Sequence, residues 1–143
     1  MMRKFQQIGD DFFVGPQPIA EDLREAQSMG VKTVVDQRMR SETAMPNANL
    51  VEQTGLDYVN IEVNKAELSS RHIDELEEVL SRHEGPYLVH CASGARATLL
   101  LMLRQARREG WTAERTFDEA KAWGYDLQSS PEFADFVRAM TAR

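Results

Sequence analysis

Short apolar segments alternate along this chain with longer segments whose apolar residues recur at helical spacing. Residues 31–35, 56–63 and 87–90 have the composition of strands, and residues 4–15 predict two short strands around an Asp-Asp turn. Alternation of strands with helices favours parallel pairing, with the helices packed on the sheet. We therefore predict one α/β domain over residues 1–143, with a mainly parallel central sheet flanked by helices.

Capping residues indicate where the helices begin and end. The first helical segment ends at Gly30, and Ser70 is placed to cap the helix that follows it. Thr112 occupies the same kind of position further along, and Ser130 precedes Pro131, a residue favoured in the first turn of a helix. These positions predict helices that start after each of the three hydroxyl residues.

The composition excludes several classes of function. A net charge of −6 disfavours nucleic acids and anionic membranes as partners, because both require a basic surface. The longest apolar run, residues 99–103, is too short to span a bilayer. A single cysteine fits a reducing cytoplasm, and no signal segment is apparent. The three histidines lack metal-ligand spacing, so we expect neither a metal nor another cofactor.

The segment from Cys91 to Arg96 lies between a predicted strand, residues 87–90, and a predicted helix, residues 97–110. Ligands of open α/β sheets bind beyond the carboxyl ends of the strands, where the loops 36–47, 64–69 and 91–96 should meet. A tight loop that enters a helix turns its N–H groups inward and holds anions. The same field stabilises a thiolate, and a guanidinium can grip an oxyanion with two hydrogen bonds. We therefore expect a nucleophilic Cys91 beside an oxyanion held by Arg96 and the backbone of Ala92, Ser93, Gly94 and Ala95.

Other polar residues follow the strands of the same edge. Arg38 should hold the cysteine loop in shape by a hydrogen bond, and Asp36 can pair with an arginine there. The side chain of His90 should point away from the loop into a buried, supporting position. The charged segment 40–47 has the composition of a lid or of plain surface.

Several motifs in order resemble a known family. The segment HCASGAR resembles the active-site loop of the bacterial phosphatase-like domain also found fused to β-lactamase-like hydrolases, which is related to dual-specificity protein tyrosine phosphatases. The segments FFVGPQP, VVDQR and YVNIEV resemble its other strands and their polar ends. The resemblance implies a phosphatase fold, Cys91 as nucleophile and Arg96 as phosphate clamp. It also implies a phosphorylated small molecule or protein as substrate.

The chain departs from the general tyrosine-phosphatase pattern in three ways. Four residues separate Cys91 from Arg96, where that pattern has five, and Ala97 replaces the usual Ser or Thr after the arginine. Asn64 stands near the place expected for the general-acid aspartate. Glu67 and Asp36 are the carboxylates left as candidates for that acid.

Three functions fit these residues. The first is a cysteine-dependent phosphatase that forms a thiophosphate intermediate. The second is a rhodanese-like sulfurtransferase that carries a persulfide on Cys91; its six-residue loop needs neither a general acid nor a hydroxyl after the arginine. The third is a non-catalytic module that binds phosphate, which has little use for an activated thiol. The resemblance favours the phosphatase.

Overall fold

Five strands form one sheet in the order β1-β2-β5-β3-β4 in the computed structural model, which describes residues 4–42 and 47–142. The strands are β1 (Gln6–Ile8), β2 (Phe12–Gly15), β3 (Thr33–Asp36), β4 (Asp57–Asn60) and β5 (Tyr87–His90). The pair β1–β2 is antiparallel, and the other three pairs are parallel. The predicted mainly parallel sheet is therefore confirmed.

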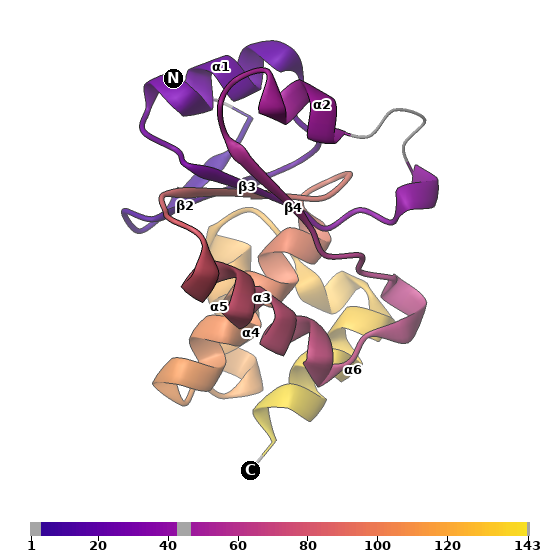
Figure 1. Cartoon of the computed structure of the whole chain (residues 1–143). Coiled ribbons are helices and arrows are strands. Elements are labelled where there is room, and N and C mark those ends of the chain that lie inside the picture. Colours follow the sequence, from indigo (N-terminus) through magenta and orange to yellow (C-terminus); the bar gives the residue numbers. More distant parts are fainter. Residues whose placement is uncertain (1–3, 43–46, 143) are drawn as a thin grey trace.

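Helices cover both faces of this sheet (Figure 1). On one face lie α1 (Ala20–Ser28) and α2 (Asn47–Glu52). On the other lie α3 (Ser70–Arg82), α4 (Ala95–Glu109), α5 (Ala113–Ala122) and α6 (Pro131–Thr141). Three short 3₁₀ helices complete the described part, namely η1 (Arg40–Glu42), η2 (Lys65–Glu67) and η3 (Leu127–Ser129). This is the single α/β domain with flanking helices that the sequence predicts.

Alternate strand residues pack against opposite helical layers, because successive side chains of a strand point to opposite faces. Val34 and Leu88 join the buried cluster that contains Leu23 of α1. Their neighbours Val35 and Val89 join the cluster formed with α4. All residues of the central strands β3 and β5 are consequently buried, as expected when both faces of a sheet are covered.

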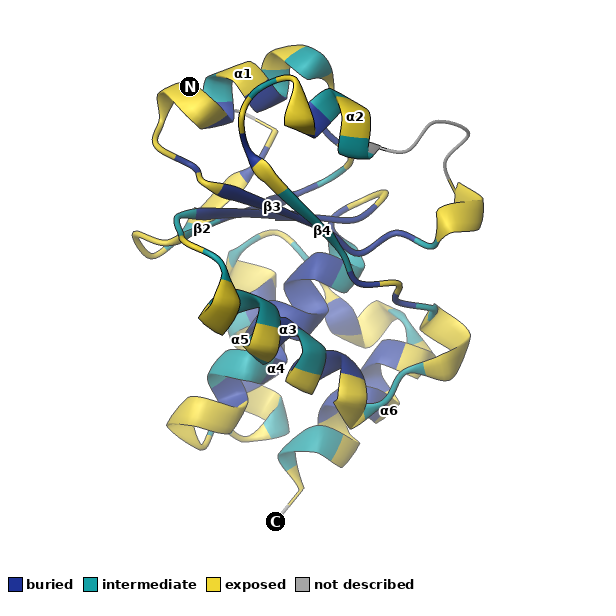
Figure 2. Ribbon diagram, in the orientation of Figure 1, coloured by how far each residue is buried: buried dark blue, intermediate teal, exposed yellow. Residues whose placement is uncertain are grey.

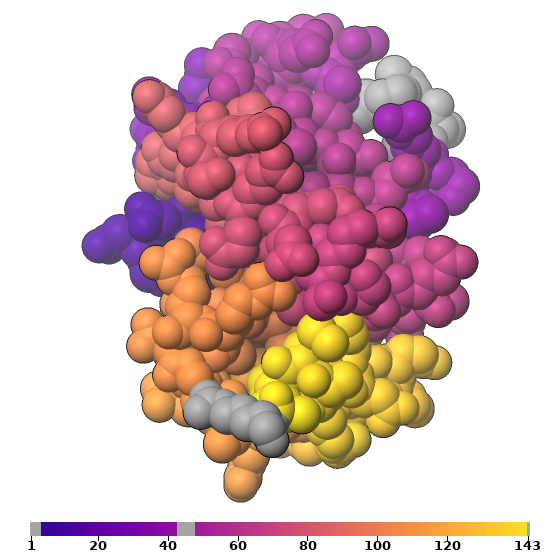
Figure 3. All heavy atoms as spheres, turned by 60° about the horizontal axis from the view of Figure 1, so that its bottom comes forward, coloured from indigo at the N-terminus to yellow at the C-terminus, as the bar shows by residue number. Residues whose placement is uncertain are grey.

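Helix α4 is the most enclosed of the helices (Figure 2). It contacts α3, α5, α6, β2 and β5, and eight of its residues are buried. Figure 3 shows α6, in yellow, beside the orange segments on the side of the molecule that covers α4. This packing fixes the helix whose first turn carries Arg96.

Three predicted boundaries were wrong. The cap of α3 is Ser69, not Ser70: its extended backbone lies outside the helix, where its hydroxyl oxygen accepts a hydrogen bond from the Arg71 N–H at 3.1 Å. Helix α4 begins at Ala95, two residues before the predicted start, because Gly94 serves as its N-cap. The caps at Thr112 and Ser130 are confirmed. Strand β4 ends at Asn60, earlier than predicted, and the chain continues as a loop.

No helix in the described ranges is long and apolar enough to cross a membrane.

Candidate active site

The cysteine loop joins the carboxyl end of β5 to the start of α4. Cys91 directly follows β5, and Gly94 adopts a left-handed conformation with φ of 99°. Glycine is required there because a side chain disfavours this backbone region. Gly94 also offers no capping side chain, so N–H groups of the first turn of α4 remain available to a bound anion.

The Cys91 sulfur lies beneath this loop. Its residue is fully buried, and the N–H of Gly94 donates a hydrogen bond to Sγ at 3.0 Å. Burial alone is common for an inert cysteine. A backbone donor aimed at the sulfur is the feature that stabilises negative charge on it. The sulfur thus lies beneath the loop with a backbone donor directed at it.

Arg96 turns toward the site and not toward solvent. Its Nη1 and Nη2 donate to the two carboxylate oxygens of Glu42, each at 2.6 Å, and Nη1 also donates to the carbonyl of Val63 at 2.9 Å. The hydrogen bond with Glu42 is the largest cause of a raised Arg96 pKa, and the charge of Cys91 raises it further. The guanidinium is therefore fixed close to the sulfur.

This arrangement leaves one side of the guanidinium available. Arginine has five N–H donors in a planar fork. Three of them serve Glu42 and Val63, which leaves the Nε–H and one Nη2 hydrogen. These two donors lie side by side and match two oxygens of a phosphate or similar oxyanion. Arg96 can thus bind an oxyanion while Glu42 holds it in place.

Glu42 was not among the residues predicted for the site. It lies on η1, and hydrogen bonding to Arg96 is the largest cause of its lowered pKa. Its Oε1 also accepts the N–H of Met39 at 2.8 Å. The only signal in the sequence was an acidic residue in the polar segment 40–47, of which residues 43–46 lie outside the described part.

A second ion pair lies behind the loop. Arg38 donates from Nε to Oδ1 of Asp36 at 3.0 Å and from Nη2 to Oδ2 at 2.8 Å. Both side chains are only 2% exposed. Tyr58 donates to the same Oδ2 at 2.7 Å. Burial raises the pKa of Asp36, but the hydrogen bonds of Arg38 and the charge of His90 outweigh it and leave that pKa below its ordinary value.

These contacts indicate a structural role for Asp36. Both carboxylate oxygens accept hydrogen bonds from buried partners, and the lowered pKa keeps the carboxyl ionised. An ionised and fully engaged carboxylate has no proton to donate to a leaving group. The geometry therefore favours Asp36 as the partner of Arg38 and not as a general acid.

Gln17 connects this ion pair to the cysteine loop. Its Oε1 accepts a hydrogen bond from Nη1 of Arg38 at 2.9 Å, and its backbone N–H donates to the Ala92 carbonyl at 3.2 Å. The predicted support of the loop by Arg38 thus runs through Gln17. Gln17 lies in the motif FFVGPQP and was not among the residues predicted for the site.

His90 is fully buried beside Asp36, with 3.8 Å between its Nδ1 and Oδ1 of the carboxylate. Burial lowers the pKa of His90 to about 4, so the imidazole is neutral at neutral pH. Nδ1 also lies 3.4 Å from the Cys91 carbonyl oxygen. His90 is therefore placed as the expected buried support of the loop.

The remaining predicted residues surround the loop. Ala92 and Ser93 are exposed, and the Ser93 hydroxyl accepts the Ala95 N–H at 3.4 Å. Asn64 caps η2, with its Oδ1 accepting the Ala66 N–H at 2.9 Å. Glu67 lies exposed at the end of η2. Arg96 of the loop 91–96 contacts Glu42 of the predicted loop 36–47 and Val63, which directly precedes the predicted loop 64–69; residues 43–46 lie outside the described part.

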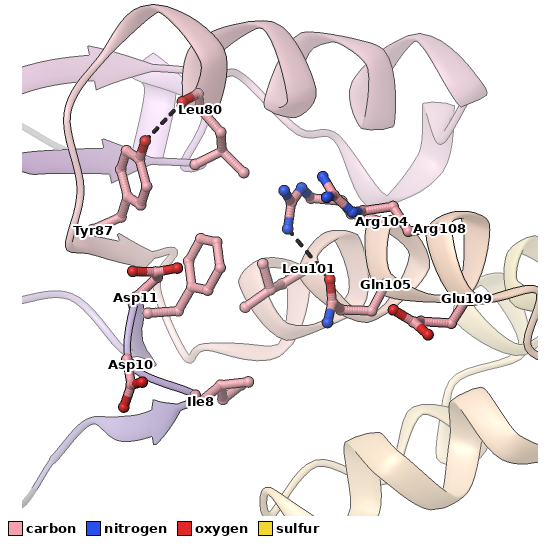
Figure 4. A pocket seen from close by; sticks show the side chains of 12 residues that line it. Ile8, Asp10, Asp11, Leu80, Tyr87, Leu101, Arg104, Gln105, Arg108 and Glu109 are labelled. Atoms are coloured by element: carbon pink, nitrogen blue, oxygen red, sulfur yellow. Dashed lines mark hydrogen bonds between the residues drawn. The ribbon is translucent and has the colours of Figure 1, made fainter.

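A separate cavity of about 460 Å³ lies at the opposite end of the strands. Figure 4 shows Asp10 and Asp11 of the β1–β2 turn on one side and Arg104 and Arg108 of α4 on the other. Its described lining contains neither a cysteine, a serine nor a histidine. No group of three metal-ligating side chains occurs in residues 4–42 or 47–142. The cysteine loop is therefore the candidate active site.

The buried ion pair generates a prediction on stability. Arg38→Met leaves the Asp36 carboxylate buried without its partner, which should lower the free energy of unfolding by about 3–5 kcal/mol. The exposed pair of Arg82 with Glu78, at 2.8 Å, supplies the control. Arg82→Met should cost less than about 1 kcal/mol. Urea unfolding measures both, and equal small losses would contradict the structural role of Arg38.

His90 generates a prediction on pH. Its folded-state pKa of about 4 lies below the value of about 6.5 in the unfolded chain, so the unfolded state binds the proton first. The free energy of unfolding should therefore fall as the pH decreases from about 6.5 to about 4, by about 3 kcal/mol in total. Because the pKa of Asp36 is lowered on folding, protonation of that carboxylate reduces the free energy of unfolding only below this pH interval.

Urea unfolding at a series of pH values measures this dependence. His90→Gln should flatten it between about pH 6.5 and pH 4, because glutamine does not titrate. His83→Gln, at a partly exposed position, should leave it unchanged. A wild-type protein without the dependence would show that His90 is not held neutral by burial.

Comparisons with known proteins agree with this architecture. The family model of the phosphatase-like domain of beta-lactamase hydrolase-like protein matches residues 4–108. The beta-lactamase hydrolase-like protein of Agrobacterium fabrum (strain C58) is 26% identical over 129 residues. That alignment covers 87% of this chain but only 30% of the relative, so the chain spans less than a third of that protein.

Solved structures show the same fold. A DUF442 protein from Shewanella putrefaciens CN-32 superposes with a TM-score of 0.82 at 23% identity, covering 99% of this chain and 90% of that one. TpbA of P. aeruginosa, crystallised with phosphotyrosine, gives a TM-score of 0.75 at 17% identity, covering 98% and 91%. The family match extends over most of the chain and includes the whole cysteine loop. The chain therefore belongs to the family of phosphatase-like domains of beta-lactamase hydrolase-like proteins, as its motifs indicated.

Proposed function

We propose that the protein is a cysteine-dependent phosphatase that hydrolyses phosphate monoesters, with residues 1–143 forming one cysteine-phosphatase-like domain. One observation carries this proposal: the Gly94 N–H donates to the Cys91 sulfur, and Arg96, which Glu42 holds by two hydrogen bonds, interacts with the charge of Cys91. Such a combination stabilises both a thiolate and the oxygens of a phosphoryl group.

The proposed reaction has two steps. In the first, the Cys91 thiolate attacks phosphorus, a sulfur–phosphorus bond forms, and the bond to the ester oxygen breaks. Arg96 and the N–H groups of the loop bind the non-bridging oxygens as charge develops on them. In the second, water attacks phosphorus, inorganic phosphate leaves, and the thiolate returns.

The ester oxygen needs a proton when it leaves from an alkyl group. Glu67 is the proposed donor. It lies on η2, which follows Val63, and the Val63 carbonyl contacts Arg96. The carboxyl of Glu67 is also exposed. Asp36 is not proposed, since its two oxygens are engaged by Arg38 and Tyr58.

The surroundings of the loop suggest the substrate class. A cavity of about 280 Å³ is lined in part by Ala95, Tyr125, Phe133 and Lys65. The Lys65 ammonium lies 5.1 Å from the centre of the Phe133 ring. The cavity combines aromatic side chains with one cation, Lys65, and one carboxylate, Asp126. We propose that it holds the part of a phosphorylated small molecule or protein side chain that carries the phosphate, the class to which the phosphotyrosine bound by TpbA belongs.

A sulfurtransferase is the second candidate, favoured by specific features of the loop. Four residues separate Cys91 from Arg96, and Ala97 provides no hydroxyl. The Thr98 hydroxyl is buried without a hydrogen-bond partner among the described residues, so it does not serve the sulfur. In this reaction the thiolate takes the outer sulfur of a donor such as thiosulfate and releases sulfite. An acceptor thiolate or cyanide then removes that sulfur and restores the thiolate.

Parallel assays separate the two chemistries. We expect the purified protein to hydrolyse an aryl phosphate, and Cys91→Ser to abolish this activity while the fold remains intact. The Ser81→Ala variant, at an exposed position of α3, serves as a substitution outside the loop. Rapid transfer of sulfur from thiosulfate to cyanide without aryl phosphate hydrolysis would contradict the phosphatase proposal and support the sulfurtransferase.

Glu42 provides a second test of the anion site. Glu42→Gln removes the charge that fixes Arg96 and should lower kcat/KM by about tenfold or more, with weaker inhibition by vanadate. Glu78→Gln, which alters an exposed ion pair on α3, is the matched control and should change neither value. If Glu42→Gln keeps wild-type values, Arg96 does not depend on this carboxylate.

A further inference from the structure

We propose that Tyr125 is a positioning residue for Cys91, whose hydroxyl fixes the peptide bond between Ser93 and Gly94 so that the Gly94 N–H points at the sulfur. This inference rests on the proposed role of Cys91 as nucleophile. It applies equally to phosphoryl and to sulfur transfer, because both require a stabilised thiolate.

The contact joins two distant segments of the chain. The Tyr125 hydroxyl donates a hydrogen bond to the Ser93 carbonyl oxygen at 3.1 Å. The next N–H along the chain, that of Gly94, donates to the Cys91 sulfur at 3.0 Å. The carbonyl of Ser93 and the N–H of Gly94 are the two ends of one peptide bond.

A trans peptide bond is planar, and its carbonyl and N–H point in opposite directions. Fixing the carbonyl therefore fixes the direction of the N–H on the other side. The Tyr125 hydroxyl binds the carbonyl end, and the N–H end donates to the sulfur. Rotation of this peptide would break both hydrogen bonds at once.

The phenol also occupies the space beside the Gly94 Cα. A Cβ at Gly94 would overlap the Tyr125 hydroxyl and would lie 2.7 Å from Cζ of its ring. The glycine is thus required both by its positive φ and by the close approach of Tyr125. The fit leaves the Ser93–Gly94 peptide little freedom to turn.

The segment that follows α5 holds Tyr125 in this position. Its backbone N–H donates to the Ala120 carbonyl at 3.0 Å, and Gly124, with φ of 96°, turns the chain directly before it. Two residues further on, Leu127 is buried in the core cluster around α4. The hydroxyl is therefore presented to the loop from a fixed backbone.

Electrostatics strengthens this arrangement. Burial, followed by the charge of Cys91, raises the pKa of Tyr125, so the phenol keeps its proton and acts as the donor. Donation to a carbonyl polarises the peptide and makes its N–H a better donor. The hydroxyl of Tyr125 thus stabilises the thiolate without touching it.

The test compares the alkylation of Cys91 by iodoacetamide in the wild type and in Tyr125→Phe, between about pH 5 and pH 10. Phenylalanine keeps the ring but removes the donor. We expect the variant to react about threefold to tenfold more slowly than the wild type at the acidic end. At the alkaline end, where the thiol is fully ionised, the two rates should be equal, which a general disturbance of the fold would not produce.

Tyr87→Phe is the matched control, since that hydroxyl donates to the Leu80 and His83 carbonyls, away from the loop. Its alkylation profile should follow the wild type. If Tyr125→Phe also follows the wild type, the positioning role is wrong while the role of Cys91 stands. If wild-type Cys91 does not react at neutral pH, the proposed nucleophile is wrong and the inference fails with it.

Discussion

The hydrogen bond from the Gly94 N–H to the Cys91 sulfur is the interaction on which the site depends. A charge on a buried atom is costly unless donors are already aimed at it. The loop that aims this donor is short and contains a left-handed glycine, so it needs support from outside. That support comes from Gln17 at Ala92 and from Tyr125 at the neighbouring carbonyl.

Two ion pairs serve this site in different ways. The pair of Asp36 and Arg38 is almost fully buried and joins the ends of β3 and β4 to the loop through Gln17. Breaking a pair of this kind leaves an uncompensated charge in the core, so its main consequence is stability. The pair of Glu42 and Arg96 is partly exposed, with 28% and 14% of the side chains accessible. Such a pair contributes little to stability, and its main effect is to orient the guanidinium of Arg96.

The sequence predicted the features that depend on local patterns. Strand β5 has the predicted bounds because four residues, three of them aromatic or aliphatic, stand between a Gly-Pro break and the cysteine. The cysteine loop was predictable because its strand, glycine and arginine are consecutive. Glu42 and Tyr125 were missed because they reach the loop across 54 and 32 positions, distances at which no pattern in one sequence reports contact. The start of α4 was missed because Gly94 resembles a loop residue although it caps the helix.

The central claim is that Cys91 accepts the transferred group. Rapid quenching during turnover of an aryl phosphate, followed by mass spectrometry of the Cys91 peptide, tests it directly. We expect one phosphoryl group on Cys91, formed and lost at the rate of turnover, and its absence in Arg96→Ala, which cannot hold the oxyanion. A sulfur atom on Cys91 after incubation with thiosulfate would assign the second chemistry to the same nucleophile. Turnover of either substrate without an adduct on Cys91 would contradict the account.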